Sequence, residues 1–272
     1  MKIAFTKMHG AGNDFVTIDN LDGRYAITPE SVARLCDRHF GIGADGLLLL
    51  EKPDGDGLDA RMVYYNADGS RGEMCGNGAR CFTAFALARG LGSEKGLRFM
   101  TDAGLISAAA ANGRYTIQMT RPAETRLNFS LDLRNGPATV HHTDTGVPHV
   151  VRFVEDVEQV DIRADGAELR FHPAFAPRGA NANFARIEED GTILLRTYER
   201  GVEDETLACG TGVTAVAILA HLVHGVPKPV TIQVRGGDRL TVEFDGTDET
   251  NIDNVKMTGP AETVFTGEIE LT

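Results

Sequence analysis

Two of the four cysteines stand in the same local pattern, and this pattern suits acid–base chemistry at sulfur. Cys75 begins the segment CGNGARCFTAFALA and Cys209 begins CGTGVTAVAILA, so each is followed by Gly-X-Gly and an apolar run. Such a run is typical of a buried helix, which places each cysteine at a helix N-terminus. The N–H groups and partial positive charge there stabilise a thiolate and hold an anion such as a carboxylate.

A pair of such sites suits inversion at a carbon next to a carboxylate. If both helix starts face one substrate, one thiolate can remove the α-proton while the other thiol delivers a proton to the opposite face. Two groups are needed because a single base returns the proton to the face it left. The N–H groups also stabilise the enolate-like charge that develops on the carboxylate. The pattern therefore predicts Cys75 and Cys209 as a catalytic pair.

The other two cysteines are explained by packing. Cys36 shares a predicted helical face with Val32 and Leu35, and Cys81 lies inside the apolar run that follows Cys75. A zinc site typically has cysteines two to four residues apart in pairs, and a thioredoxin-like site has Cys-X-X-Cys. The cysteines of this chain have neither spacing. We expect no metal site.

Two glycine-rich segments match the dinucleotide fingerprint in letters but not in context. That fingerprint requires a strand, then the glycines, then a helix. GIGADG (41–46) follows a predicted helix and enters a predicted strand, so its order is reversed. GTGVTA (210–215) opens a helix, but residues 200–207 separate it from the preceding strand. We therefore expect no nucleotide, and no other cofactor motif is present.

Charge and hydropathy exclude some classes of binding partner. The 272 residues include 27 Lys and Arg against 39 Asp and Glu, for a net charge of −12. Nucleic acids and anionic membranes favour basic surfaces, so neither is an expected partner. Lys7 and His9 interrupt the N-terminal segment, which lacks a signal-peptide pattern. The longest apolar stretch, 213–223, is shorter than the roughly 20 residues that span a bilayer. We expect a cytoplasmic protein with reduced thiols.

Short β-like runs such as KIAFTKM, GLLLLE and TILLRTYE dominate the chain. Asn112-Gly113, DGTI and GGDRL predict hairpin turns, which favours antiparallel sheet. Helices are expected over 29–40, about 76–88 and about 210–224, with Thr28 as the cap of the first. The last two are apolar on nearly all faces. Two buried helices, each among short strands, predict an α+β fold of two domains.

The chain also repeats itself. Cys75 and Cys209 are 134 residues apart, and the same offset relates Tyr64 to Tyr198, Gly12 to Gly146 and Val16 to Val150. Four matches in one register indicate two structurally similar halves.

Six segments, spread over the whole chain, resemble segments of the diaminopimelate epimerase family and occur in the same order. They are MHGAGNDF, GIGADG, NADGSRGEMCGNGARC, TGVPH, RGANANFA and YERGVEDETLACGTG. The resemblance implies an isomerase that needs no pyridoxal phosphate and interconverts LL- and meso-diaminopimelate, in lysine and peptidoglycan synthesis. It also implies a homodimer of chains with two pseudo-symmetric α/β domains, each a curved, mainly antiparallel sheet around a central helix. Because the last strand of family members returns to the first domain, we expect domains at 1–120 with 264–272, and at 121–263.

The resemblance assigns roles to residues of this chain. Cys75 and Cys209 match the catalytic acid/base pair. The positions whose backbone holds the reacting carboxylate are Gly76, Asn77, Gly210 and Thr211. The substrate-binding positions are Asn13, Asn66, Asn181, Glu199 and Arg200. Arg200 is the candidate for the distal carboxylate, because a guanidinium binds it bidentately. His149 and Glu199 match positions that adjust the pKa values of the cysteines.

This sequence departs from some family members at two positions. Gly46 stands where some carry Gln, and Val147 where some carry Asn, so neither side chain can hydrogen-bond a substrate here. A further difference lies between the two halves. The offset of 134 maps His149 onto Phe15 and Glu199 onto Tyr65. We hypothesise that this unequal pairing fixes which sulfur is protonated at rest.

Two other functions are compatible with the cysteine pair. One is another cofactor-independent racemase, for proline, hydroxyproline or a basic amino acid. Proline racemase-like sequences usually carry His after the first Cys-Gly, where this chain has Asn77. The other is a carboxylate-binding or redox-sensing protein, which would not exchange the α-proton of a bound amino acid with solvent.

Overall fold

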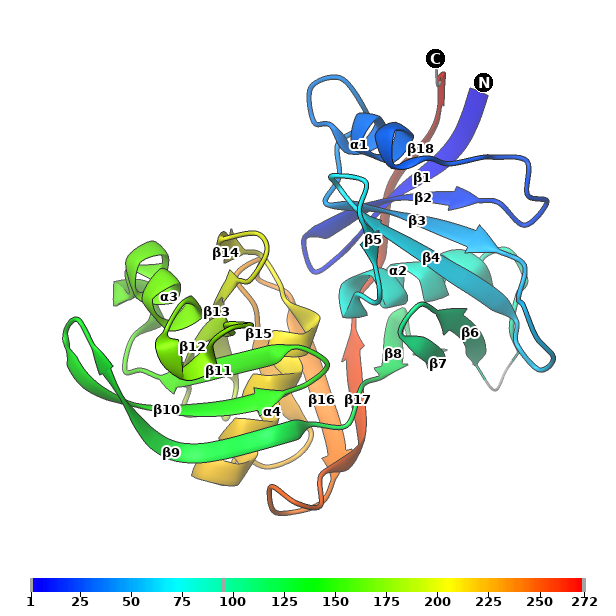
Figure 1. The fold of residues 1–272 in the computed structure, drawn as a ribbon. Coiled ribbons are helices and arrows are strands. Elements are labelled where there is room, and N and C mark those ends of the chain that lie inside the picture. Colours follow the sequence, from blue (N-terminus) through cyan, green and yellow to red (C-terminus); the bar gives the residue numbers. More distant parts are fainter. Residues whose placement is uncertain (1, 94–95, 271–272) are drawn as a thin grey trace. The chain divides into compact units, whose positions relative to one another are not determined.

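A computed structural model describes residues 2–93 and 96–270 of the chain. The chain forms two compact units (Figure 1). The first unit comprises Met1–Ile117 and Gly259–Thr272, and the second comprises Gln118–Thr258. The sequence had placed these boundaries at 120/121 and 263/264.

The first unit is a mainly antiparallel sheet with two helices. Its strands pair in the order β18-β1-β2-β3-β4, and β4 also pairs with β5 and with the β6-β7-β8 meander. Only the β2–β3 and β4–β6 pairs are parallel among the strand pairs described in this unit. The strands are β1 Lys2–Gly10, β2 Asn13–Asp19, β3 Gly46–Glu51, β4 Ala60–Asn66, β5 Arg71–Gly72, β6 Leu97–Thr101, β7 Gly104–Ala111, β8 Arg114–Gln118 and β18 Glu262–Glu270, and the helices are α1 Pro29–Cys36 and α2 Gly76–Leu87.

The second unit repeats this topology. The order is β9-β10-β11-β12-β13, and β13 pairs with β14 and with the β15-β16-β17 meander. The strands are β9 Ala123–Leu133, β10 Gly136–Asp144, β11 Pro148–Phe153, β12 Asn181–Ile187, β13 Ile193–Glu199, β14 Asp204–Thr206, β15 Val230–Gln233, β16 Arg239–Asp245 and β17 Asp253–Gly259. The helices are α3 Ile162–Arg170 and α4 Gly210–His224, with 3₁₀ turns at Val157–Gln159 and Pro173–Phe175.

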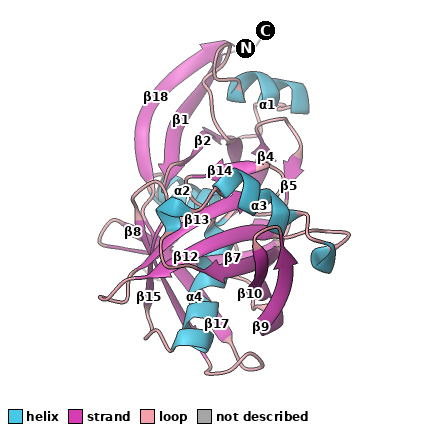
Figure 2. Cartoon of the chain, turned by 90° about the vertical axis from the view of Figure 1, so that its left-hand side faces the viewer, coloured by secondary structure: helices cyan, strands magenta, loops and turns pink. Residues whose placement is uncertain are grey.

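The shared topology confirms the predicted α+β fold of two similar halves. Figure 2 shows how strands predominate over helices. The last strand completes the symmetry, because β18 pairs antiparallel with β1 as β9 pairs antiparallel with β10. In each unit, one long helix contacts several strands of its own sheet: α2 contacts β1–β4, and α4 contacts β9–β12.

The register of the repeat differs from the sequence prediction in two strands. The offset of 134 holds between α2 and α4, but β12 begins 135 residues after β3, and β13 begins 133 residues after β4. Phe15 pairs with Gly46, and His149 pairs with Asn181. The structural counterpart of Glu199 is therefore Asn66 and not Tyr65, and that of Tyr198 is Tyr65 and not Tyr64.

The helix predictions were correct at α2 and α4 and incomplete elsewhere. The first helix ends at Cys36, four residues early, because the Asp37 carboxylate accepts the N–H groups of His39 and Phe40 at 2.7 Å and forms a turn. Helix α3 was missed, since the charges and the glycine in IRADGAELR obscure its periodicity. The repeat contained the missing signal, because the offset maps α1 onto residues 163–170.

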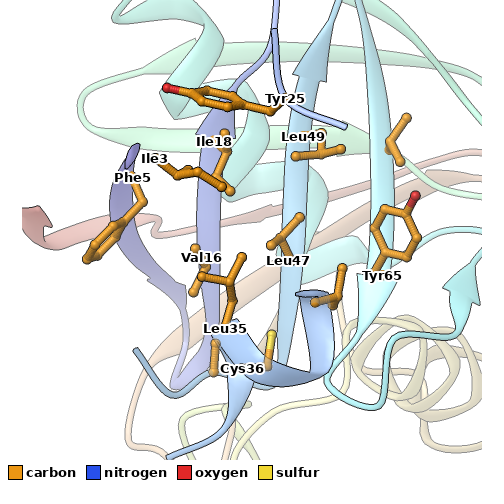
Figure 3. Packing of buried hydrophobic residues seen from close by; sticks show 13 residues of the cluster. Ile3, Phe5, Val16, Ile18, Tyr25, Leu35, Cys36, Leu47, Leu49 and Tyr65 are labelled. Atoms are coloured by element: carbon orange, nitrogen blue, oxygen red, sulfur yellow. The ribbon is translucent and has the colours of Figure 1, made fainter. Parts of the chain in front are cut away.

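Helix α1 covers one face of the first sheet. Figure 3 shows Leu35 and Cys36 packed against side chains of β1, β2, β3 and β4. Burial raises the pKa of the Cys36 thiol to about 12 and that of Cys81 to about 12. Both thiols therefore stay protonated, as expected of cysteines that pack in a core.

No described helix is long and apolar enough to cross a membrane.

We predict that Gly166→Ala destabilises the second unit. A methyl group at Gly166 of α3 would lie 2.5 Å from the Tyr198 side chain, closer than any real Cβ contact. Overpacking of this kind costs about 1–3 kcal/mol, whereas helix propensity alone would stabilise the protein by about 1 kcal/mol. Urea unfolding measures the sign. Ala164→Gly, in the same helix, is the control for propensity, and a rise in stability for Gly166→Ala would contradict the close contact.

Candidate active site

Cys75 is the N-cap residue of α2. Its backbone is extended, and its sulfur accepts a hydrogen bond from the Gly78 N–H at 3.5 Å. A methyl group at Gly78 would lie 3.3–3.4 Å from Leu48, Phe15 and Cys75 itself. The first turn of α2 therefore packs tightly on the sheet below it, and the sulfur occupies the positive end of the helix as predicted.

Asn13 holds an acceptor against this sulfur. Its Oδ1 lies 3.5 Å from Cys75 Sγ and accepts a hydrogen bond from Asn77 Nδ2 at 3.3 Å. Its Nδ2 donates to Asp45 Oδ2 at 2.8 Å, which fixes the orientation of the amide. Because an amide oxygen only accepts, this contact favours the S–H form of Cys75 in this conformation.

A charged network supports Asn13 from behind. Arg38 bridges Asp14 and Asp45, at 2.9 and 2.8 Å. Burial raises the pKa of Asp14, but hydrogen bonds from Arg38 and Lys7 outweigh it and lower the pKa to about 2. Asp14 therefore stays ionised at neutral pH. The Arg38 guanidinium that it holds also donates to Asp45, the residue that accepts from Asn13.

Asn66 is the last residue of β4 and is tied to the same region. Its Oδ1 accepts from the Tyr64 hydroxyl at 2.8 Å, and its Nδ2 donates to Ser70 Oγ at 3.0 Å. The next N–H, of Ala67, donates to the carbonyl of Asp45, whose side chain holds Asn13. The first unit thus gathers five predicted residues around the start of α2: Asn13, Asn66, Cys75, Gly76 and Asn77.

Cys209 is the N-cap residue of α4 in the second unit. Its sulfur lies 3.5 Å from the Thr211 hydroxyl, and the Thr145 hydroxyl donates to the Thr211 carbonyl at 2.9 Å. A methyl group at Gly212 would lie 2.7 Å from Asn183 Oδ1, so this turn can approach the sheet only with glycine at that position.

His149 lies directly beneath this turn. Its side chain is fully buried on β11, and its Cε1 is 3.4 Å from the position of a Gly212 Cβ. Burial, with a smaller contribution from the charges of His142 and Arg200, lowers the pKa of His149 to about 3. The ring is therefore neutral throughout the physiological pH range.

Asn181, Glu199 and Arg200 lie where β12 begins and β13 ends. Asn181 Nδ2 donates to the Pro148 carbonyl at 3.0 Å, and its Oδ1 accepts the Arg200 N–H at 2.9 Å. Glu199 accepts from the Thr206 hydroxyl at 2.8 Å. The Asn181 amide thus fixes the backbone from which the Arg200 guanidinium extends, while the Arg200 side chain is half-exposed. The second unit places His149, Asn181, Glu199, Arg200, Cys209, Gly210 and Thr211 on adjoining elements.

The sequence interpretation missed three supporting residues: Asp45, Asn183, and Thr197, whose hydroxyl donates to Asn183 Oδ1 at 3.0 Å. Asp45 lies in the GIGADG segment, and Asn183 shares a sheet face with Asn181 because residues two apart on a strand point the same way. The departure at Gly46 has a steric reason. A Cβ there would lie 2.6 Å from the Tyr65 carbonyl, so a side chain at this position would require the backbone of the neighbouring strand to shift.

Within residues 2–93 and 96–270, no group of three His, Cys, Asp or Glu side chains is placed to hold a metal ion.

Known proteins are similar to this chain in sequence and in fold. The family model for diaminopimelate epimerase matches residues 5–125 and 142–264. The chain is 42% identical to a diaminopimelate epimerase of Aquifex aeolicus, with 97% of each chain covered. It is also 42% identical to the diaminopimelate epimerase of Paraburkholderia xenovorans, with 100% of this chain and 99% of the other covered.

Two crystal structures share the fold at much lower identity. A phenazine biosynthesis protein of the PhzF family from Bacillus anthracis superposes with a TM-score of 0.76 at 15% identity, over 100% of both chains. A hydroxyproline epimerase from Agrobacterium vitis superposes with a TM-score of 0.74 at 15% identity, over 98% of this chain and 92% of the other. These likenesses concern the fold alone. On the match to the family model and the identity to full-length relatives, the chain belongs to the diaminopimelate epimerase family.

Proposed function

We propose that this protein is a diaminopimelate epimerase, an isomerase that inverts the α-carbon between LL- and meso-diaminopimelate. One observation carries the proposal: a chain of this family has a cysteine at the N-cap of the long sheet-packed helix in each of its two similar units. Duplicated helix starts supply the two acid–base groups that inversion requires.

The reaction needs one thiolate and one thiol. The backbone N–H groups of Gly76 and Asn77, together with those of Gly210 and Thr211, bind the α-carboxylate. A thiolate takes the α-proton, so that a C–H bond breaks and an S–H bond forms. The opposite thiol then gives its proton to the carbon. The charge that develops on the carboxylate is stabilised by the same N–H groups and helix dipoles.

The distal end of the substrate sets specificity. Asn13, Asn66, Asn181, Glu199 and Arg200 are the proposed contacts, and Arg200 pairs with the distal carboxylate. Its backbone is already fixed by Asn181. A proline-type racemase substrate has no second charged end for such residues to bind, so the polar set favours diaminopimelate over that alternative.

The two cysteines do not have equivalent surroundings. Beneath Cys209 lies the neutral ring of His149, where the first unit has Phe15. Glu199 stands where the first unit has Asn66, by the strand register. We propose that these two residues adjust the two thiols unequally, so that one sulfur is deprotonated at rest while the other keeps its proton.

The proposed cellular setting is the cytoplasm, where the thiols remain reduced, and the proposed assembly is a homodimer. The net charge of −12 supports a small-molecule substrate over nucleic acid or an anionic membrane.

We predict that the protein exchanges the α-proton of LL-diaminopimelate with solvent. In D₂O, NMR should show loss of the α-proton signal together with formation of the meso isomer. Cys75→Ser and Cys209→Ser should each lower the rate of conversion to the meso isomer by at least about 10²-fold, because general acid–base catalysis contributes that much. Cys36→Ala is the matched control and should keep the rate, since Cys36 is the last residue of α1 and packs in the core of the first unit.

Other outcomes separate the alternatives. Exchange with proline or hydroxyproline but not with diaminopimelate would assign the protein to the proline-type racemases. Binding of diaminopimelate without exchange would identify a carboxylate-binding protein.

We predict that oxidation joins Cys75 to Cys209. If the two sulfurs flank one carbon, diamide can remove two electrons and two protons from the thiols and form a disulfide. Activity should then be lost, and dithiothreitol should restore it. Peptide mapping identifies the bond, and Cys36→Ala should oxidise in the same way. Full activity in protein that carries this bond would contradict the proposed geometry.

We predict unequal effects on the two thiols when their neighbours change. His149→Phe copies the first unit, and Glu199→Gln removes a charge without changing shape. Rates of alkylation by iodoacetamide against pH, read separately at each cysteine by mass spectrometry, should shift by different amounts at Cys75 and Cys209. Equal shifts at both cysteines would refute the proposed asymmetry.

A further inference from the structure

The floor beneath the first turn of the long helix differs between the two units. In the first unit, Phe15 and Leu48 lie under Gly78, and Tyr64 packs edge-on against Phe15 at 6.2 Å between ring centroids. The strand register gives the counterparts in the second unit, which are His149, Asn183 and Thr197. All three are buried. The floor is therefore aromatic and aliphatic beneath Cys75, whereas it is polar beneath Cys209.

The amide of Asn183 can adopt only one orientation there. Its Nδ2 donates to the Val150 carbonyl at 3.0 Å and to the Asn181 carbonyl at 3.2 Å. Its Oδ1 accepts from the Thr197 hydroxyl at 3.0 Å. A carbonyl cannot donate, so both main-chain oxygens require the NH₂ end where it stands, and the hydroxyl proton is directed at the other end.

This orientation determines the proton position on His149. The ring Nδ1 lies 3.2 Å from Asn183 Nδ2. An amide nitrogen donates and does not accept, so Nδ1 must carry the lone pair. A proton on Nδ1 would place two N–H groups face to face. The neutral ring therefore has its proton on Nε2.

The surroundings also oppose a charged ring. His149 is fully buried, and the charged or titratable groups that act on it are His142 on β10 and Arg200 beyond β13, both of which disfavour an imidazolium. Cys209, the N-cap residue of α4, is the titratable group that shares the contact with Gly212.

The Nε2–H has no acceptor among the described residues. Buried donors are nearly always paired, so an unpaired one requires a reason. The ring cannot simply turn to find a partner, because Asn183, which contacts its Nδ1, is fixed by three hydrogen bonds of its own. The ring lies against Gly212, and so does the Cβ of Cys209, each 3.4 Å from the same point. A thiolate on Cys209 that turns inward from Thr211 would supply the missing acceptor.

We propose that Asn183 is a positioning residue, which fixes His149 as an N–H donor to the thiolate of Cys209 and prevents the ring from acting as a base toward that sulfur. Thr197 acts behind Asn183 by holding its Oδ1. The proposal rests on the proposed function only in treating Cys209 as a catalytic thiol. It assigns the thiolate-stabilising role to the second unit, whereas Asn13 presents an acceptor to Cys75 in the first.

The first test reads the tautomer directly. In protein labelled with ¹⁵N-histidine, NMR of His149 should show a protonated Nε2 and an unprotonated Nδ1 between pH 8 and 5. A wild-type ring with its proton on Nδ1 would overturn the proposal.

The second test reads the sulfur. Asn183→Leu copies Leu48 of the first unit, so this fold already accommodates the side chain at the equivalent position. Alkylation of Cys209 near neutral pH should slow by roughly tenfold, which corresponds to one unit of thiol pKa. Alkylation of Cys75 should be unchanged. Thr197→Val should slow Cys209 less, and Thr197→Ser, which keeps the hydroxyl, should restore the wild-type rate. An equal change at both cysteines, or none at Cys209, would overturn the proposal.

These readouts do not depend on turnover. If solvent exchange of the α-proton occurs but the tautomer is wrong, only the role of Asn183 fails. If the tautomer is as stated and no exchange occurs, the proposed function fails.

Discussion

Both halves of this protein depend on one interaction, that of a cysteine sulfur with the N-terminus of a helix. The first turn of that helix packs directly on the sheet of its own unit. The N–H groups of that turn have no partners within the helix, and they attract negative charge. They remain available to a ligand only if the turn packs on its sheet through the backbone. Gly78 and Gly212 meet this requirement, because each lies within contact distance of the side chains below. The sheet in each unit surrounds the helix and so holds the sulfur at a fixed place.

The two units use one topology for two different chemical environments. Cys75 faces the amide oxygen of Asn13, which is held by Asp45 and the Arg38 network. Cys209 stands above a ring that is held by Asn183. An acceptor next to one sulfur and a donor next to the other favour opposite protonation states. A reaction that starts with one thiol and one thiolate benefits from this difference, since symmetrical surroundings would leave the starting state undetermined.

The last strand matters to the first unit because β18 takes the place beside β1 that β9 takes beside β10 in the second unit. Strand β18 returns to pair along β1, and the buried guanidinium of Arg80 in α2 donates to the Pro260 carbonyl just before that strand begins, at 3.0 Å. The end of the chain is thereby tied to the helix that begins at Cys75. The resemblance had implied this return, and the strand pairing provides its register.

Local sequence determined the position of the two cysteines at helix starts, the two buried helices and the hairpin turns. Glycines, caps and apolar runs act over a few neighbouring residues, so these features can be predicted locally. The offset of 134 also implied the repeat. What tertiary structure alone decided was the register of β12 and β13, and with it the counterpart of Glu199 and the polar floor beneath Cys209. That floor joins His149, Asn183 and Thr197 from three strands. Their contacts depend on which residues pair across the sheet, and a shift of one residue turns a side chain to the opposite face. No local pattern in the sequence specifies that pairing.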